Sequence, residues 1–96
     1  MFWVYIVTNC NDSALYIGVT NSLLRRTWKH REGMGANFPA RYQYKKLIYY
    51  EQYRDIRDAI AGESQLKKWS RAKKIALINR LNPNWIDLGA DVLLDT

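Results

Sequence analysis

Two segments near the start of the chain place the strongest constraint on its fold. Residues 2–8 (FWVYIVT) and 15–20 (LYIGVT) are rich in the aromatic and β-branched side chains that favour strands. A polar cluster, NCNDS at residues 9–13, separates them. Because two strands joined by so short a turn pair as an antiparallel hairpin, we expect the chain to begin with one.

A helix and a third strand are expected after the hairpin. Asn21 is a suitable N-cap for a helix that begins near Ser22, and Gly33 and Gly35 supply a stop signal for it. Residues 46–53 (KLIYYEQY) then have the composition of a third strand.

Two further helices complete the pattern. Asp55 is expected to cap a helix that runs to about Trp69, and Ser70 is expected to cap a second helix that ends before Asn82-Pro83. The order β-β-α-β-α-α predicts a small α+β domain in which helices flank a central three-stranded antiparallel sheet.

The size and composition fit one globular domain. The chain has 96 residues, of which 48% are hydrophobic and 25% charged; we place its core at about 2–85 and a short C-terminal tail at 86–96. No apolar run approaches the roughly 20 residues that span a bilayer, and the N-terminus lacks the basic residues of a signal peptide. A single cysteine, Cys10, excludes an internal disulfide and fits a cytoplasmic protein. We expect a monomer.

The charge is concentrated in the middle of the chain. The net charge is +6, and all fifteen basic residues lie between Arg25 and Arg80. This distribution favours binding of a polyanion such as nucleic acid, although a solvated basic surface gives the same pattern.

One acidic residue interrupts an apolar helix face. The helix expected after residue 55 carries a core-facing stripe made of Ile56, Ala59, Ile60 and Leu66. At about 100° per residue, Glu63 falls near the middle of this stripe. A carboxylate there needs a cation, a metal ion or a hydrogen-bonding partner. A structural ion pair with an arginine across the fold, or a different helix register, would explain the pattern as well.

Tyrosines and a glycine mark the hairpin. Tyr5 and Tyr16 lie on the first and second strands, and Gly18 shares a face with Tyr16. A glycine inside a strand often marks a place where another group approaches the backbone closely. Half-buried sheet tyrosines without catalytic function remain the plainer interpretation of each tyrosine taken alone.

The first expected helix is basic on two faces. Arg26 and His30 share one face through their i,i+4 spacing, and Arg25 and Lys29 share another. Periodicity does not decide which arginine faces a site. A second basic stretch, a phosphate-binding strip or simply a solvated helix surface, contains Lys67, Lys68, Arg71, Lys73, Lys74 and Arg80.

Taken together, these positions resemble the GIY-YIG nuclease superfamily. The resemblance rests on Trp3-Val4-Tyr5, Tyr16-Ile17-Gly18, Arg26, His30 and Glu63. It covers about residues 2–85 and looks closest to small stand-alone bacterial members, similar to the nuclease domain of the excision-repair endonuclease. The first motif half reads Trp-Val-Tyr in place of Gly-Ile-Tyr.

The resemblance implies a divalent-metal-dependent nuclease that hydrolyses DNA phosphodiester bonds. Its implied catalytic residues are Tyr5, Tyr16, Arg26, His30 and Glu63, and Glu63 would hold one ion, Mg²⁺ or Mn²⁺. Arg26 lies ten residues after Tyr16, which is the family's spacing for its catalytic arginine. Residues expected to contact nucleic acid are Gly18, Arg25, Lys29, Lys68, Arg71, Lys74 and Asn82.

Two other functions fit the same residues. A non-catalytic nucleic-acid-binding module on this fold would keep the basic surface without needing Glu63. A protein-interaction domain would show neither nucleic-acid binding nor the steep salt dependence of phosphate contacts. Relatives of this fold act in DNA repair, recombination, restriction and mobile-element movement, often with added targeting domains, so a protein partner for targeting is also expected.

Overall fold

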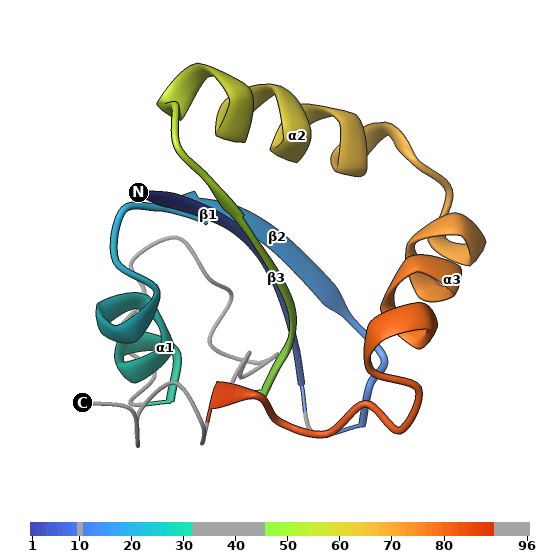
Figure 1. Ribbon diagram of the computed structural model, residues 1–96. Coiled ribbons are helices and arrows are strands. Elements are labelled where there is room, and N and C mark those ends of the chain that lie inside the picture. Colours follow the sequence, from blue (N-terminus) through green and yellow to red (C-terminus); the bar gives the residue numbers. More distant parts are fainter. Residues whose placement is uncertain (10, 32–45, 90–96) are drawn as a thin grey trace.

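The computed structural model of the chain describes residues 1–9, 11–31 and 46–89, except the side chains of residues 29–31. Its elements in chain order are β1 (Phe2–Thr8), β2 (Leu15–Thr20), α1 (Leu23–Arg31), β3 (Lys46–Tyr53), α2 (Ile56–Lys68) and α3 (Arg71–Leu81). This is the predicted order β-β-α-β-α-α, and the α+β class with one antiparallel sheet is confirmed (Figure 1). The expected stop signal at Gly33 and Gly35 and the tail beyond residue 89 lie outside the described residues.

The hairpin of β1 and β2 forms one side of the sheet. The strand order is β2-β1-β3, so β1 is central, and both pairs are antiparallel. Tyr5 lies opposite Gly18 on β2 and opposite Tyr50 on β3. A register shift between Ile6 and Val7 marks an irregularity in the pairing of β1 with β3. The central position of β1 explains why five of its residues in succession, beginning at Val4, are buried.

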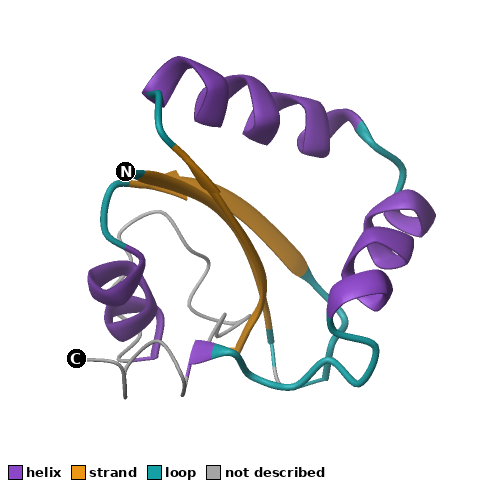
Figure 2. Ribbon diagram, viewed as in Figure 1, coloured by secondary structure: helices purple, strands orange, loops and turns teal. Residues whose placement is uncertain are grey.

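Helices cover both faces of the sheet. Figure 2 shows α2 and α3 on one side and α1 on the other. The core cluster on the side of α2 and α3 comprises Val4, Ile6, Ile17, Ile48, Tyr49, Ala59, Leu66 and Ile78. A smaller cluster on the side of α1 comprises Tyr5, Val7, Leu23 and Leu47. The alternation of side chains along β1 therefore sends Tyr5 toward α1 and its neighbours Val4 and Ile6 toward α2.

Two of the three predicted helix caps are confirmed and one is wrong. The Asp55 carboxylate accepts a hydrogen bond from the Arg57 backbone N–H at 2.8 Å, and the Ser70 hydroxyl accepts one from Lys73 at 3.2 Å. The cap of α1 is not Asn21 but Ser22, whose hydroxyl accepts from the Arg25 N–H at 3.3 Å. The Thr20 hydroxyl bonds both the N–H and the carbonyl oxygen of Ser22, which holds this residue at the end of β2 in position to cap.

The core-facing stripe predicted for α2 is also wrong in part. Ile56 and Ile60 are 39% and 48% exposed, whereas Ala59 is fully buried. A Cβ atom added to Gly62 would lie 2.5 Å from the Tyr53 phenol oxygen. The small residues at 59 and 62 thus allow the closest approach of α2 to the sheet, and this rotation turns Ile56 and Ile60 outward.

The segment after α3 returns to the beginning of β3. The Asp87 carboxylate accepts a hydrogen bond from the Leu47 N–H at 3.0 Å, and the Leu88 N–H donates to the Leu47 carbonyl at 2.7 Å. Leu88 packs against the smaller cluster on the α1 side. These bonds hold the first part of the expected C-terminal tail against the sheet.

Candidate active site

The Tyr5 ring crosses the face of the hairpin over Gly18. Tyr5 is only 2% exposed, and a Cβ atom added to Gly18 would lie 2.5 Å from its phenol oxygen. The close approach that a glycine inside a strand indicates is therefore the approach of Tyr5 itself. Gly18 makes room for this phenol at the edge strand β2.

Three other candidate residues converge on the Tyr5 phenol. Burial raises the pKa of Tyr5 well above its usual range, and the neighbouring groups Tyr16 and Glu63 raise this pKa further. The Arg26 guanidinium acts in the opposite direction and lowers the pKa of Tyr5. These interactions place Tyr16 of β2, Arg26 of α1 and Glu63 of α2 within electrostatic range of the Tyr5 phenol. Four of the five predicted catalytic residues are therefore electrostatically coupled in the structure, and their catalytic function stays a prediction.

The orientation of α1 distinguishes its two arginines. Arg25 is exposed, whereas Arg26 is half-buried and lines a pocket at one end of the sheet. Capping by Ser22 fixes the rotation of the helix that produces this difference. Of the two arginines, Arg26 is thus the one placed beside Tyr5, the choice that periodicity left open.

Glu63 lies at the boundary between the buried and the exposed sides of α2. Its side chain is 17% exposed, and one carboxylate oxygen is 3.1 Å from the Lys67 ammonium, one turn farther along the helix. One alternative explanation of Glu63 was an ion pair with an arginine across the fold; the ion pair that the structure shows is with Lys67 of the same helix. Lys67 is 55% exposed and has room to leave this position.

The donor set around Glu63 suits a hard divalent cation with few protein ligands. The described residues contain no group of three or more histidine, cysteine or acidic side chains able to hold a metal ion. Mg²⁺ nevertheless binds commonly through one or two carboxylates, keeping several waters and adding substrate phosphates. A mostly buried carboxylate whose present cation is an exchangeable lysine fits that mode, and phenol oxygens lie nearby.

A pocket of about 270 Å³ opens beside these residues. It is lined by Phe2, Val19, Thr20, Asn21, Arg26 and Ile56. The sequence does not reveal this pocket, because its lining residues lie far apart in the chain and only the fold brings them together. Ile56, an isoleucine that is partly exposed to solvent, forms one wall of the pocket.

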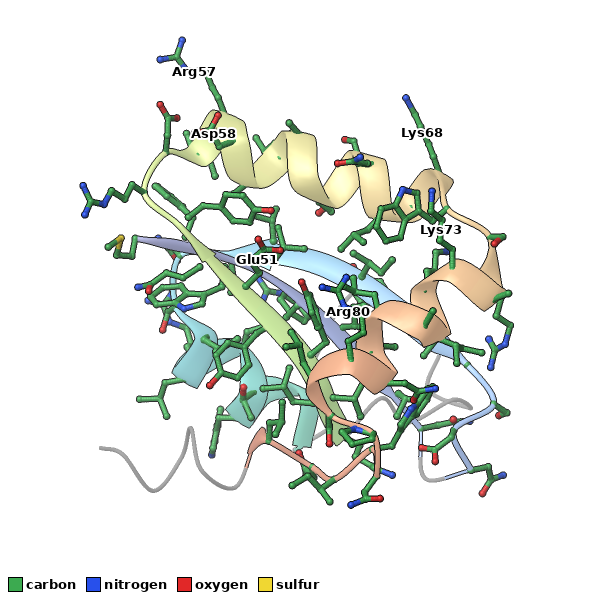
Figure 3. The ribbon with its side chains drawn as sticks, turned by 45° about the vertical axis from the view of Figure 1, so that its right-hand side comes forward. Glu51, Arg57, Asp58, Lys68, Lys73 and Arg80 are labelled. Carbon is green, nitrogen blue, oxygen red and sulfur yellow. The ribbon has the colours of Figure 1, made fainter. Side chains whose placement is uncertain are left out.

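The other residues expected to contact nucleic acid lie away from Tyr5 or have structural contacts. Lys68 points away from the sheet at the end of α2 (Figure 3). Arg71 is exposed and donates to the Asp12 carbonyl at 3.3 Å. Lys74 on α3 is half-buried. The side chains of Lys29 and His30 lie outside the described part of the chain.

Asn82 has a structural function in the described residues. It is 4% exposed, and its side-chain amide donates to the carbonyl oxygens of Ile48 and Ile86 at 3.1 and 2.9 Å. Its side-chain oxygen accepts from the Ile86 N–H at 3.1 Å. These bonds join the end of α3 to the middle of β3. Contact of Asn82 with nucleic acid stays a prediction.

Comparison with known proteins identifies the family of the chain. The family model described as the GIY-YIG catalytic domain matches residues 1–76, which include Tyr5, Tyr16, Arg26 and Glu63. The chain belongs to the GIY-YIG family. The family match confirms the resemblance inferred from the motif residues. Three similar proteins have also been found.

All three similar proteins are bacterial and carry the name UPF0213. A UPF0213 protein of Clostridium perfringens is 38% identical over 79 residues, which is 82% of this chain and 84% of the relative. One of Pediococcus pentosaceus is 33% identical over 79 residues, which is 82% of each chain. The solution NMR structure of a UPF0213 protein from Bacillus halodurans matches with a TM-score of 0.57 and 27% identity, covering 91% of this chain and 93% of that one.

The helices of the structure are short. Among the described residues, no helix has the length and apolar character needed to cross a bilayer.

Proposed function

We propose that this GIY-YIG chain is a divalent-metal-dependent nuclease that hydrolyses phosphodiester bonds of DNA. The observation that supports it most directly is the convergence of Arg26, Tyr16 and Glu63 on the buried Tyr5 phenol. Phosphodiester hydrolysis needs a cation and donors on the phosphoryl oxygens, a group that accepts a proton from water, and stabilisation of the leaving group. The converging side chains include a candidate for each of the first two needs.

Glu63 is the proposed ligand of one Mg²⁺ or Mn²⁺ ion. When bound, such an ion polarises phosphate oxygens and lowers the pKa of a coordinated water. Glu63 would hold it from α2, after Lys67 leaves the carboxylate oxygen that it contacts at 3.1 Å. Arg26 would bind the phosphate through its planar set of N–H donors, on the side of the site that α1 provides.

The two tyrosines have unequal surroundings and therefore different proposed functions. Burial favours the protonated form of Tyr5, so this phenol is suited to donate a hydrogen bond to water or phosphate. Tyr16 is half-buried on the edge strand β2, where water reaches it more easily. We therefore assign proton acceptance from the attacking water to Tyr16 and orientation of that water to Tyr5. His30 would relay the proton or bind phosphate.

One observation favours a second candidate function, a non-catalytic nucleic-acid-binding module. The pair between Glu63 and Lys67 neutralises the candidate metal ligand, as in a site that does not load metal. Under either function the ligand is nucleic acid. Cytoplasmic location, which the single cysteine supports, belongs to the same proposal, as do a monomeric state and a protein partner for targeting.

Cleavage assays separate the two functions. Single-stranded, duplex and branched DNA are incubated with Mg²⁺, Mn²⁺ or EDTA, using wild type and Glu63→Gln. Asp58→Asn is the matched control, because Asp58 is an exposed acidic residue on the same helix (Figure 3). Metal-dependent cleavage that Glu63→Gln abolishes and Asp58→Asn retains supports the nuclease. Salt-sensitive DNA binding without cleavage by wild type favours the binding module.

A further inference from the structure

The pocket lined by Arg26 shares this residue with the candidate active site. The other lining residues are the first residue of β1, the last two residues of β2 with the residue that follows them, and the first residue of α2. These ends and α1 lie at the same end of the sheet (Figure 1). A group bound in the pocket would therefore stand beside a phosphate held by Arg26.

The pocket combines apolar walls with polar groups at one end. Phe2, Val19 and Ile56 provide an aromatic ring and two branched aliphatic side chains, and Asn21 and Arg26 provide hydrogen-bonding groups. Its volume of about 270 Å³ lies just below the range of pockets for drug-sized ligands, so it suits one planar ring system. Pockets of this character receive single unstacked bases in enzymes that act on nucleic acids.

The exposed isoleucines of α2 connect the pocket with Glu63. Ile56, Ile60, Glu63 and Lys67 follow one another at helical i,i+4 and i,i+3 spacing and so lie on one stripe of α2. The rise of 1.5 Å per residue places Ile56 about 10 Å from Glu63 along the helix axis. The pocket residue Ile56 and the candidate metal ligand Glu63 therefore lie about two helical turns apart on one side of α2. The stripe presents apolar surface at its first half and charge at its second half.

From this juxtaposition we infer that the pocket binds an unpaired nucleobase next to the scissile phosphate, and that the preferred substrate is single-stranded DNA. The inference rests on the proposed function, because it takes Glu63 and Arg26 as the phosphate end of the site. A base in a duplex is stacked on both faces and paired at its edge, so it reaches the pocket only after costly unstacking. A single strand offers the same ring without that cost, and stacking on Phe2 contributes to its affinity.

Equilibrium binding in EDTA tests the inference without any cleavage. The probes are a fluorescently labelled single strand, the duplex of the same sequence, and a strand of equal length with abasic sites in place of its bases. The variants are Phe2→Leu, which removes the ring but keeps an apolar side chain, and Ile56→Ser. Ile86→Ser is the matched control, because Ile86 is 57% exposed and does not line the pocket.

We expect the single strand to bind about tenfold more tightly than the duplex and the abasic strand. Removing one base–aromatic contact, worth about 1–3 kcal/mol, should weaken single-strand binding about tenfold in Phe2→Leu. Ile56→Ser should weaken it in the same direction, and Ile86→Ser should leave it unchanged. Circular dichroism melting of each variant verifies that it is folded.

Each alternative result has a distinct meaning. Equal affinity for the single strand and the abasic strand, or no effect of Phe2→Leu and Ile56→Ser, would refute the base pocket. Metal-dependent duplex cleavage in that case would leave the proposed nuclease intact. Concentration-dependent dimerisation that Ile56→Ser abolishes would show that a second copy occupies the pocket and would also refute the inference. Absence of any DNA binding would remove the proposed function itself.

Discussion

Replacing Lys67 with methionine should strengthen metal binding at Glu63. The Lys67 ammonium lies 3.1 Å from the Glu63 carboxylate and must leave it before a metal ion binds. Because Lys67 is 55% exposed, its pair with Glu63 is worth only about 0.2–1 kcal/mol after solvent screening. At 1.4 kcal/mol per tenfold, loss of this competitor predicts a dissociation constant for Mn²⁺ that is about 1.4- to fivefold lower. Methionine keeps the length and helix preference of the side chain.

Titration of the DNA-free protein with Mn²⁺, followed by electron paramagnetic resonance of the free ion, measures this constant directly. Lys68→Met is the matched control, because Lys68 is the next lysine of α2 and points away from the sheet (Figure 3). It should change Mn²⁺ affinity less than Lys67→Met does. Unchanged or weaker Mn²⁺ binding in Lys67→Met would mean that Lys67 does not compete with the metal, and the reasoning from the ion pair would be wrong.

Three further predictions concern stability. Gly18→Ala should lower the melting temperature by at least about 4 °C, because its Cβ atom would lie 2.5 Å from the Tyr5 phenol oxygen and the packing must shift at a cost of about 1–3 kcal/mol; an unchanged melting temperature would contradict this packing. The free energy of unfolding should fall as pH rises above about 10. Burial raises the pKa of Tyr5 in the folded state, so above this pH the phenol loses its proton in the unfolded state while it is still protonated in the folded state. Urea titrations should show a shallower fall in Tyr5→Phe, and an identical slope would refute the assignment. Asn82→Ala should cost about 2–4 kcal/mol in urea unfolding, because carbonyl oxygens of Ile48 and Ile86 lose a buried donor.

The positions of the strands and helices could be predicted from the sequence because they depend mainly on neighbouring residues in the chain. Side-chain type alone predicted β1 and β2, and a carboxylate or hydroxyl at Asp55 and Ser70 predicted where α2 and α3 begin. The cap of α1 was misassigned by one residue, since Asn21 and Ser22 both suit the position and only the Thr20 hydroxyl decides between them. The choice depends on a hydrogen bond between these side-chain and backbone groups, which the spacing of residues in the sequence does not predict.

The rotation of α2 escaped the sequence for a tertiary reason. A count of apolar residues placed Ile56 and Ile60 toward the core, but contact distance decided the rotation. Ala59 and Gly62 approach the sheet more closely than an isoleucine face allows. The same rotation leaves Glu63 with 17% of its side chain exposed, at the border of the site. The sequence therefore correctly predicted that the Glu63 carboxylate is largely withdrawn from solvent and has a cationic partner, although the stripe assigned around it was partly wrong.

A glycine inside a strand or helix points to the candidate site only where charged side chains of both signs lie near it. Gly18 in a strand and Gly62 in a helix are both unfavourable in their elements, and each accommodates a tyrosine phenol at the same 2.5 Å from an added Cβ atom. Tyr53 beside Gly62 lies near Glu51 and Asp58, whose negative charges raise its pKa together with burial. Tyr5 beside Gly18 instead has a guanidinium opposing a carboxylate. Because a phosphate binds to cationic donors and a metal ion to anionic ligands, the charges of both signs around Tyr5 support the proposed site beside Gly18, whereas the contact of Gly62 with Tyr53 is explained by packing.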